Sequence, residues 1–240
     1  MRIFETEQDI KDNCLNAKGL NLVPTMGNLH EGHLSLIEET KNYNGKTIVS
    51  IFINPLQFGP NEDFKNYPRT VASDIKKLKK IDCDYAFIPQ DNFAKEIKLI
   101  KAPSISKKLC GKNRPGHFDG VLTILNKMFK IIEPEIAIFG KKDYQQLSVI
   151  RQLVKDLNYD IKIVAVDTQR EVNGLAISSR NQQLTTKEKE KSAVIYKALN
   201  AMAKSSRTVS SEIIDLGKSI LEEESKCIHI DYIEIVDRTN

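Results

Sequence analysis

The sequence predicts an α/β fold in which a doubly wound parallel sheet is followed by a small C-terminal α+β domain. As far as about residue 170, β-branched runs alternate with amphipathic segments of about ten to fifteen residues, a pattern typical of a parallel sheet with helices on both faces. Beyond that point the chain changes to lysine- and glutamate-rich segments. A chain of 240 residues can bury one large core and carry a small appendage.

The elements of the sheet domain can be justified in order. A helix over 7–18 begins after the N-cap residue Thr6 and stops at Gly19, which can adopt the left-handed conformation of a helix end. The strands are short apolar, mostly β-branched runs, predicted over 19–23, 46–53, 84–88, 97–102, 136–139 and 161–166. The other helices have apolar residues at helical spacing and are predicted over 34–40, 70–80, 120–132 and 144–157.

The C-terminal part is predicted to hold helices over 185–204 and 210–224 and one strand over 229–236. This is too little for an independent large domain, so we expect a small lid. The predicted division is a Rossmann-like nucleotide- and substrate-binding domain over 1–169 and a lid domain over 170–240.

Composition narrows the function classes. A net charge of +4 suits an anionic small substrate, while 7% aromatic residues and no tryptophan disfavour a nucleic-acid surface. The four cysteines, Cys14, Cys83, Cys110 and Cys227, form no C-x-x-C pair and are expected to be reduced thiols. No leader or long apolar run is evident, so we expect a cytoplasmic protein without membrane contact.

The most informative motif runs from Pro24 to Leu36 and reads P-T-M-G-N-L-H-E-G-H-L-S-L. It joins a predicted strand to a predicted helix, so His30 and His33 lie where free N–H groups and the helix dipole favour phosphate. Residues three apart share a helix face, and Gly32 between them lets a ligand approach the backbone. The motif therefore predicts a triphosphate site.

Four further segments are rich in polar residues. The runs F-I-N-P-L-Q-F-G (52–59) and F-G-K-K-D-Y-Q-Q-L (139–147) each span the end of a predicted strand. R-P-G-H-F-D-G-V (114–121) opens a helix, and R-E-V-N-G-L-A-I-S-S-R-N (170–181) follows the last strand of the sheet. Ligands of open α/β sheets bind beyond the carboxyl ends of the strands, so the histidine turn and the first two segments are expected to meet along one crevice.

Together these motifs resemble the pantoate–β-alanine ligase (pantothenate synthetase) family of H-x-G-H nucleotidyltransferases. The resemblance runs in order from about Leu22 to Asn181, with an echo at 231–235. It implies that pantoate and ATP, with Mg²⁺, give pantoyl adenylate and pyrophosphate, and that β-alanine then displaces AMP to form pantothenate. It also implies a homodimer formed by the larger domain.

The resemblance assigns roles to individual residues. The catalytic group is His33, His30, Lys142 and Arg180. The ATP-binding group is Met26, Gly27, Asn28, Leu29, His30, Glu31, Gly32, His33, Gly140, Lys141, Lys142, Asp143, Gln169, Ile177, Ser178, Ser179 and Arg180. Gln57 and Gln146 match the amides that hold pantoate, and Gln57 is also assigned to β-alanine.

Some positions depart from the family pattern or stay open. Lys141 stands where the family is usually acidic, Asp167 where proline is common, Ser73 where a carboxylate is common, and Ile177 where methionine or leucine is usual. Asp74 is a weak candidate for a Mg²⁺ ligand, together with a weaker supporting role for Arg69. His117 is either a catalytic donor or, more readily, a structural residue, and His229 is expected to be structural.

Two other function classes are compatible with part of the sequence. Another H-x-G-H nucleotidyltransferase, activating a different carboxylate or phosphate, would share the histidine turn but need not carry the glutamine segments. A non-catalytic nucleotide or nucleic-acid binder would be expected to show a clustered basic or aromatic strip.

Overall fold

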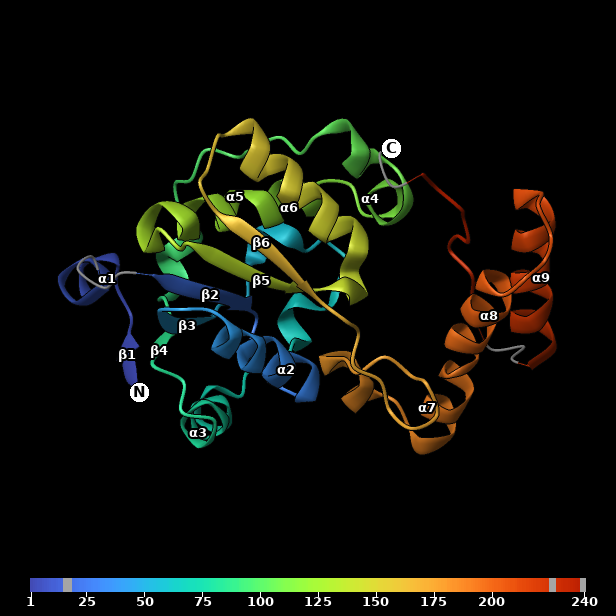
Figure 1. Cartoon of the computed structure of the whole chain (residues 1–240), viewed down its shortest axis with the longest axis horizontal. Coiled ribbons are helices and arrows are strands. Elements are labelled where there is room, and N and C mark those ends of the chain that lie inside the picture. Colours follow the sequence, from blue (N-terminus) through green and yellow to red (C-terminus); the bar gives the residue numbers. More distant parts are fainter. Residues whose placement is uncertain (15–18, 225–227, 238–240) are drawn as a thin grey trace. The chain divides into compact units, whose positions relative to one another are not determined.

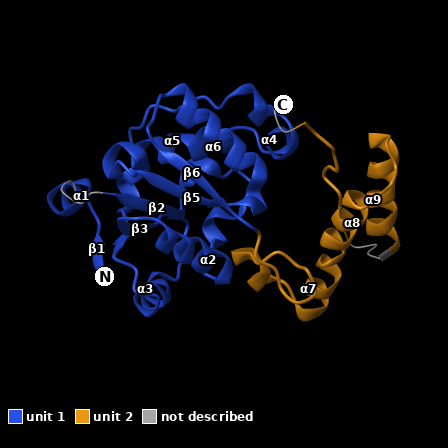
Figure 2. Cartoon of the chain, in the orientation of Figure 1, with its two compact units in different colours: residues 1–167 blue, residues 168–240 orange. Residues whose placement is uncertain are grey.

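The structure is a computed structural model that describes residues 1–14, 19–224 and 228–237. It divides into two compact units, residues 1–167 and 168–240 (Figure 2). The predicted boundary follows residue 169. Part of the predicted first helix, residues 15–18, lies outside the described residues, as does Cys227.

The first unit is built on a six-stranded sheet in which every pairing is parallel, as predicted (Figure 1). The strand order is β1-β4-β3-β2-β5-β6. The strands are β1 (Arg2–Phe4), β2 (Leu20–Thr25), β3 (Lys46–Ile51), β4 (Tyr85–Phe87), β5 (Ile136–Gly140) and β6 (Lys162–Val166). β1 was not predicted, because three residues with only one buried side chain leave no periodic pattern.

Helices cover both faces of this sheet (Figure 1). The α-helices of the first unit are α1 (Glu7–Cys14), α2 (Glu31–Glu39), α3 (Val71–Lys80), α4 (Leu109–Asn113), α5 (His117–Ile132) and α6 (Tyr144–Asp156). Its short 3-10 helices are η1 (Thr40–Asn42), η2 (Pro55–Gln57), η3 (Asp63–Asn66), η4 (Asp91–Ala94), η5 (Ser104–Lys107) and η6 (Lys141–Asp143). The second unit contains η7 (Ser179–Gln183), α7 (Thr186–Ser192), α8 (Val194–Ala203) and α9 (Ser210–Glu224).

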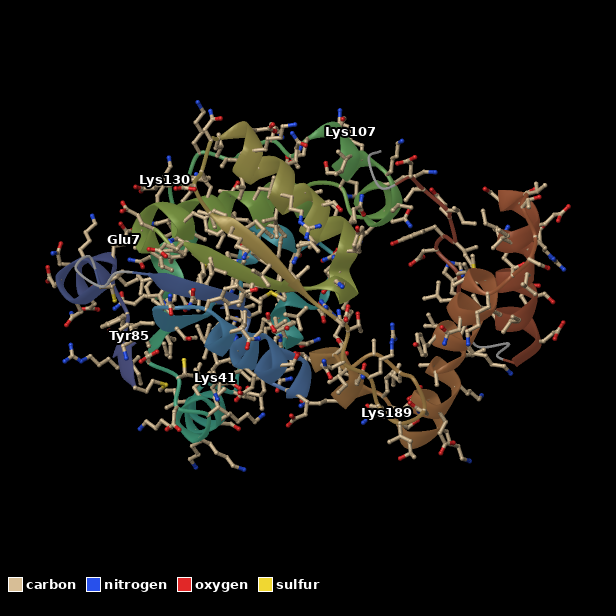
Figure 3. All side chains as sticks on the ribbon, viewed as in Figure 1. Glu7, Lys41, Tyr85, Lys107, Lys130 and Lys189 are labelled. Carbon is tan, nitrogen blue, oxygen red and sulfur yellow. The ribbon has the colours of Figure 1, made fainter. Side chains whose placement is uncertain are left out.

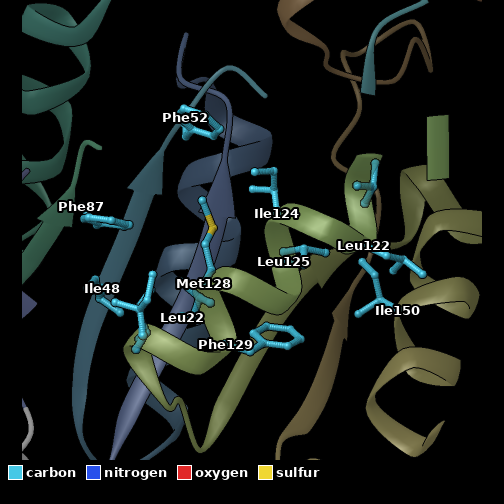
Figure 4. Packing of buried hydrophobic residues seen from close by; sticks show 14 of the residues in the cluster. Leu22, Ile48, Phe52, Phe87, Leu122, Ile124, Leu125, Met128, Phe129 and Ile150 are labelled. Atoms are coloured by element: carbon cyan, nitrogen blue, oxygen red, sulfur yellow. The ribbon is translucent and has the colours of Figure 1, made fainter. Parts of the chain in front are cut away.

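The two faces of the sheet carry separate apolar clusters. Leu22 and Ile48 pack with Phe129 of α5 in the larger cluster (Figure 4), whereas their neighbours Val23 and Val49 belong to the cluster on the other face. Successive residues of a strand point to opposite faces, so strands covered on both sides read as continuous apolar runs. Because the strands are covered on both faces, their carboxyl ends are held in place, and the polar segments begin at these ends.

Two predicted strands are wrong. Residues 97–102 form no strand because the N–H groups of Ile100 and Ala102 donate to the Thr123 hydroxyl and the Asp119 carboxylate, both 2.9 Å away on α5. Residues 229–236, all of them described, also form no strand, since no neighbouring strand pairs with them. The predicted helix over 185–204 is divided at Ala193 into α7 and α8.

The described part of the second unit is therefore helical, with one isolated antiparallel bridge between Arg170 and Ala176. Among the described residues, none of the helices is both long and apolar enough to cross a membrane.

Candidate active site

The histidine motif lies at the point where the strand order of the sheet reverses. From β2 the chain continues to β3 and β4 on one side, and β5 and β6 are added on the other. The turn after β2 carries the histidines, and η6 after the neighbouring β5 carries Lys142. Such a reversal at the carboxyl edge is the usual ligand position in open α/β sheets.

The two histidine rings form one compact pair. His30 is the N-cap residue of α2 and His33 lies in its first turn, with the His33 N–H donating to the His30 carbonyl at 2.7 Å. The rings stack with centroids 4.0 Å apart and planes inclined by 22°. Both Nδ1 atoms are buried and have no hydrogen-bond partner among the described residues. The pair can therefore offer two ring nitrogens to a ligand.

The surroundings of the pair keep both rings uncharged. Burial, followed in order of effect by the charges of His30, Lys142 and Lys77, lowers the pKa of His33 to about 3. Burial also lowers the pKa of His30, again with Lys142 and Lys77 contributing. Two cations from different elements thus act on the same two imidazoles.

Other lysines of the described residues lie on several different elements. Lys41 of η1, Lys107 of η5 and Lys130 of α5 are exposed, and Figure 3 labels them on separate elements. Lys142 differs from these because its charge acts on the half-buried histidines, while its Nζ also contacts the Asp143 carboxylate at 3.0 Å.

Helix α3 holds the backbone of the histidine turn. Asp74 is fully buried and accepts hydrogen bonds from the N–H groups of Asn28 (2.9 Å) and Leu29 (2.8 Å). The Thr70 hydroxyl donates to the same carboxylate at 3.0 Å, and the Lys77 ammonium donates to the Leu29 carbonyl. Both carboxylate oxygens of Asp74 thus accept hydrogen bonds from within the protein.

The turn needs this support because two successive residues are left-handed. Gly27 has φ +82° and Asn28 has φ 48°. A Cβ at residue 27 would lie 3.0 Å from Ile51 Cγ2 and 3.1 Å from Asp74 Oδ2, so glycine fits both the conformation and the space.

Sequence reasoning missed Lys77 and the contacts of Asp74. A signal was available in the spacing, since Asp74 lies four residues before the buried Leu78 and therefore on the inner face of α3. The identity of its partners, two backbone N–H groups at residues 28 and 29, could not be read from that spacing.

Gln57 lies beside Met26 of the histidine motif. It ends η2, immediately beyond β3, and its Nε2 is 3.3 Å from Met26 Sδ. Its Oε1 accepts from Asn54 Nδ2 at 3.0 Å. Gln146 is half-buried in the first turn of α6, just after Lys142. The glutamine and histidine segments of the first unit thus follow adjacent strands, as predicted.

The remaining predicted ATP residues belong to the second unit. Ser178 is the N-cap residue of η7 and accepts from the Arg180 N–H at 3.3 Å; Ser179 is buried and Arg180 is exposed. The Ile177 N–H donates to the Gln169 carbonyl at 3.0 Å, which closes the loop. The role of these residues at the ATP site stays a prediction.

Two departures from the family pattern meet each other. Lys141 follows β5 and Asp167 follows the adjacent β6, and Lys141 Nζ lies 2.6 Å from Asp167 Oδ1. The extra positive charge at 141 is thus matched locally.

The other two histidines are not members of the stacked pair. His117 is buried at the start of α5, where its Nδ1 lies 2.8 Å from the Gln57 carbonyl. His229 is exposed in the second unit, 3.6 Å from Asp231.

Comparison with known proteins agrees with this geometry. The family model described as pantoate-beta-alanine ligase matches residues 2–240. The pantothenate synthetase of Thermosipho africanus is 42% identical over 100% of this chain and 89% of its own length, and that of Caldicellulosiruptor bescii is 45% identical over 98% and 86%.

Solved structures give the same result. A pantothenate synthetase of Thermus thermophilus superposes with a TM-score of 0.95 at 36% identity, covering 99% of this chain and 88% of that one. A Francisella tularensis pantoate-beta-alanine ligase, solved with beta-gamma ATP and beta-alanine, gives a TM-score of 0.80 at 37% identity over 92% and 86%. The chain therefore belongs to the pantoate–β-alanine ligase family, whose members are ligases that join pantoate to β-alanine.

Proposed function

We propose that this chain makes pantothenate in two steps through a free pantoyl adenylate. A carboxylate oxygen of pantoate bonds to the α-phosphorus of ATP as the bond to pyrophosphate breaks. The amine of β-alanine then attacks the acyl carbon, loses a proton, and AMP leaves. The observation that carries the proposal is the uncharged, stacked His30–His33 pair on which the charges of Lys142 and Lys77 act.

The first step requires stabilisation of negative charge rather than a protein nucleophile. Charge develops on the phosphate oxygens as the carboxylate attacks, so preorganised N–H donors and ammonium groups lower the barrier. His30 and His33 would donate from neutral rings, and Lys142 would supply the charge. Neutral rings suit this role because a cationic pair 4.0 Å apart would repel itself before ATP arrives.

Pantoate is assigned to Gln57 and Gln146, and β-alanine to Gln57. An amide can bond hydroxyl and carboxylate groups without neutralising the attacking carboxylate. The contact of Gln57 Nε2 with Met26 Sδ supports this assignment, because it brings the proposed substrate amide next to the proposed ATP turn.

The second unit is proposed to complete the triphosphate site. Ser178, Ser179 and Arg180 would bind the β- and γ-phosphates, with the Gln169–Ile177 pair against the nucleotide. An arginine fork matches phosphate oxygens in two bonds, and its exposed position in this unit leaves it accessible to a ligand.

Mg²⁺ is proposed to arrive with ATP. The described residues contain no group of three or more His, Cys, Asp or Glu side chains placed to hold a metal, and the oxygens of Asp74 accept from Asn28, Leu29 and Thr70. Asp74 therefore does not fit a resident cation. Mg²⁺ is commonly held by substrate phosphates with few protein ligands, so we assign it to the ATP complex and derive no step from it.

The family resemblance implies the assembly, whereas the location is inferred from the composition of the sequence. We propose a homodimer formed by the first unit, and a cytoplasmic enzyme that acts on small molecules.

The adenylate step can be measured separately from the second step. We expect exchange of labelled pyrophosphate into ATP that needs pantoate and Mg²⁺ but proceeds without β-alanine. Mass spectrometry of the denatured protein should show no added acyl mass, since AMP and not a side chain carries the acyl group. Exchange that depends on β-alanine, or a modified protein, would contradict the free adenylate.

A further inference from the structure

The segment R-P-G-H-F-D-G (114–120), which opens the central helix α5, takes no part in the reaction scheme proposed above. Gly116, with φ +81°, precedes the helix, and His117 is its first residue. His117 is buried, and both of its ring nitrogens have partners. Those partners link the helix to the turn that carries Gln57.

The hydrogen bonds of His117 specify its tautomer. Nδ1 lies 2.8 Å from the Gln57 carbonyl, which can only accept, so Nδ1 carries the proton. Nε2 lies 3.1 Å from Arg114 Nη1, which can only donate, so Nε2 is the acceptor. Burial lowers the pKa of His117 and thereby favours this neutral form.

Arg114 is itself fixed by a two-bond contact. Its Nε and Nη2 each lie 2.7 Å from one oxygen of Glu62, on the loop that follows η2. Fork-to-carboxylate pairs of this kind set direction as well as distance. The arginine therefore presents Nη1 to the imidazole in a defined direction.

A second set of contacts fastens the same turn to the same helix. Asn54 Nδ2 donates to the Gly120 carbonyl and to Gln57 Oε1, both at 3.0 Å. A Cβ at residue 120 would lie only 2.1 Å from the Leu56 carbonyl oxygen, so the backbone of η2 rests directly on α5. Gln57 is thus held through its carbonyl by His117 and through its side chain by Asn54.

We propose that His117, oriented by the Glu62–Arg114 pair, is a positioning residue that fixes Gln57 for pantoate. The inference rests on the proposed role of Gln57 as a pantoate-binding amide. His117 does not touch the reacting atoms in this scheme. It acts on substrate only through the position of the Gln57 backbone.

The first test compares two replacements of His117 with a matched control. His117→Phe keeps the ring but removes both nitrogens, so we expect the pantoate KM to rise about tenfold, as for a small displacement of a binding group, with the ATP KM unchanged. His117→Asn keeps a donor near the position of Nδ1 and should restore most of the pantoate affinity. Thr123→Val removes a buried hydroxyl of the same helix that contacts Asp119 and Ile100, and should leave both KM values unchanged.

The Gln57→Ala variant distinguishes the proposed role of Gln57 from that of His117. If it leaves the pantoate KM unchanged, the proposed role of Gln57 fails and the inference fails with it. If Gln57→Ala raises the pantoate KM while His117→Phe does not, only the role of His117 is overturned. An equal rise of the pantoate and ATP KM values in His117→Phe would also overturn it.

The unmodified protein supplies an independent test that does not depend on the folding of a variant. With 4 histidines in the chain, the nitrogen signals of each ring can be assigned by long-range ¹⁵N–¹H correlation. We expect His117 to be neutral at pH 7 with its proton on Nδ1. A proton on Nε2 alone would overturn the proposed contact with Gln57, and a doubly protonated ring would overturn the proposed orientation by Arg114.

Discussion

His33 is the residue whose ordinary chemistry the fold changes most. A histidine in water is half-charged near pH 6.5, whereas burial beside His30 and two lysines lowers the pKa of His33 to about 3. In the proposed mechanism, His33 offers an N–H donor to the phosphate rather than a positive charge, and Lys142 supplies the charge.

Replacement of His33 should affect chemistry more than folding. We expect His33→Ala to lower kcat by about a hundredfold or more, the size found when a charge-stabilising donor is removed. The melting temperature should change little, because the Nδ1 of this ring makes no hydrogen bond that the variant would lose. Steady-state kinetics and calorimetry measure both quantities. His229→Ala, which alters an exposed ring of the second unit, serves as the control. Near-normal turnover in His33→Ala would remove His33 from the mechanism.

The same residue should make stability depend on pH in one direction. Below pH 6.5 the unfolded chain protonates this histidine, while the folded chain, with a pKa of about 3, does not. The unfolded state then binds more protons, so the free energy of unfolding should fall as pH decreases from 6.5 toward 3. His33→Phe removes this group and should lose less stability over that interval than the parent protein.

Denaturant unfolding at pH 7 and pH 4.5 measures the difference between the two proteins. Parallel losses in both would show that His33 titrates in the fold as it does in water. Lys142 and Lys77 are present in both proteins, so their charges are common to the two unfolding measurements.

At the scale of elements, the position of the histidine turn depends on α3. Asp74 joins this helix to residues 28 and 29 by two bonds to backbone N–H groups. The sequence indicated the helix and the polar residue but suggested a metal ligand. In the structure this carboxylate accepts hydrogen bonds from two backbone N–H groups and from the Thr70 hydroxyl.

Asp74→Asn tests the two roles against each other. The amide keeps one acceptor oxygen and turns an NH₂ group toward a backbone donor, so the free energy of unfolding should fall by about 1–3 kcal/mol. Turnover should fall too, because both histidines follow this turn, but the Mg²⁺ concentration for half-maximal activity should not change. Ser73→Ala, on the exposed side of the same helix, is the matched control.

Asp74 would be a metal ligand if the Asp74→Asn variant had unchanged stability but needed a higher Mg²⁺ concentration for half-maximal activity. Urea unfolding and a Mg²⁺ titration of the exchange reaction supply the two measurements.

Elements with a periodic pattern were predictable, and elements defined by a distant partner were not. The strand of residues 46–53 was recognised because burial on both faces makes an almost continuous apolar run, and that of residues 161–166 by its β-branched side chains, although they are only partly buried. Residues 97–102 show the same composition, but their N–H groups bond to side chains of α5, which local sequence does not reveal. β1 exists because it pairs with β4, which lies far along the chain, and its own three residues carry no signal.

The candidate site likewise contains residues that the sequence indicated and contacts that it did not. His30, His33, Gln57 and Lys142 were recognisable because each follows the end of a strand within a distinctive motif. The support of these residues by Asp74 and Lys77 was not recognisable, since a hydrogen bond across 45 residues is not encoded in local spacing. Long-range contacts of this kind follow from the fold as a whole.

At the scale of the whole molecule, the residues proposed for the triphosphate site come from both compact units. Those of the second unit include Ser178 and Arg180, whose own loop is closed by the hydrogen bond between Ile177 and Gln169. Arg180→Ala should therefore slow pyrophosphate exchange by about a hundredfold, as expected for the loss of a phosphate clamp. Unfolding should be unaffected because the side chain is exposed.

Lys187→Ala, on α7 of the same unit, removes an exposed charge outside the motif and controls for net charge. Exchange rates that are equal in the two variants would remove Arg180 from the triphosphate site. Rapid-quench measurement of a single turnover would locate the defect in the adenylate step.

The position of β2 in the sheet has a consequence for biosynthesis. β2 is completed at Thr25, yet one of its two neighbours, β5, begins only at Ile136. A nascent chain that has not yet emerged from the ribosome as far as Ile136 holds an apolar strand with one edge open, and such edges pair readily with other chains. The strand that leads to the proposed catalytic histidines is therefore open to such pairing during synthesis, and we expect a messenger truncated before that residue to yield an aggregating product rather than a weak enzyme.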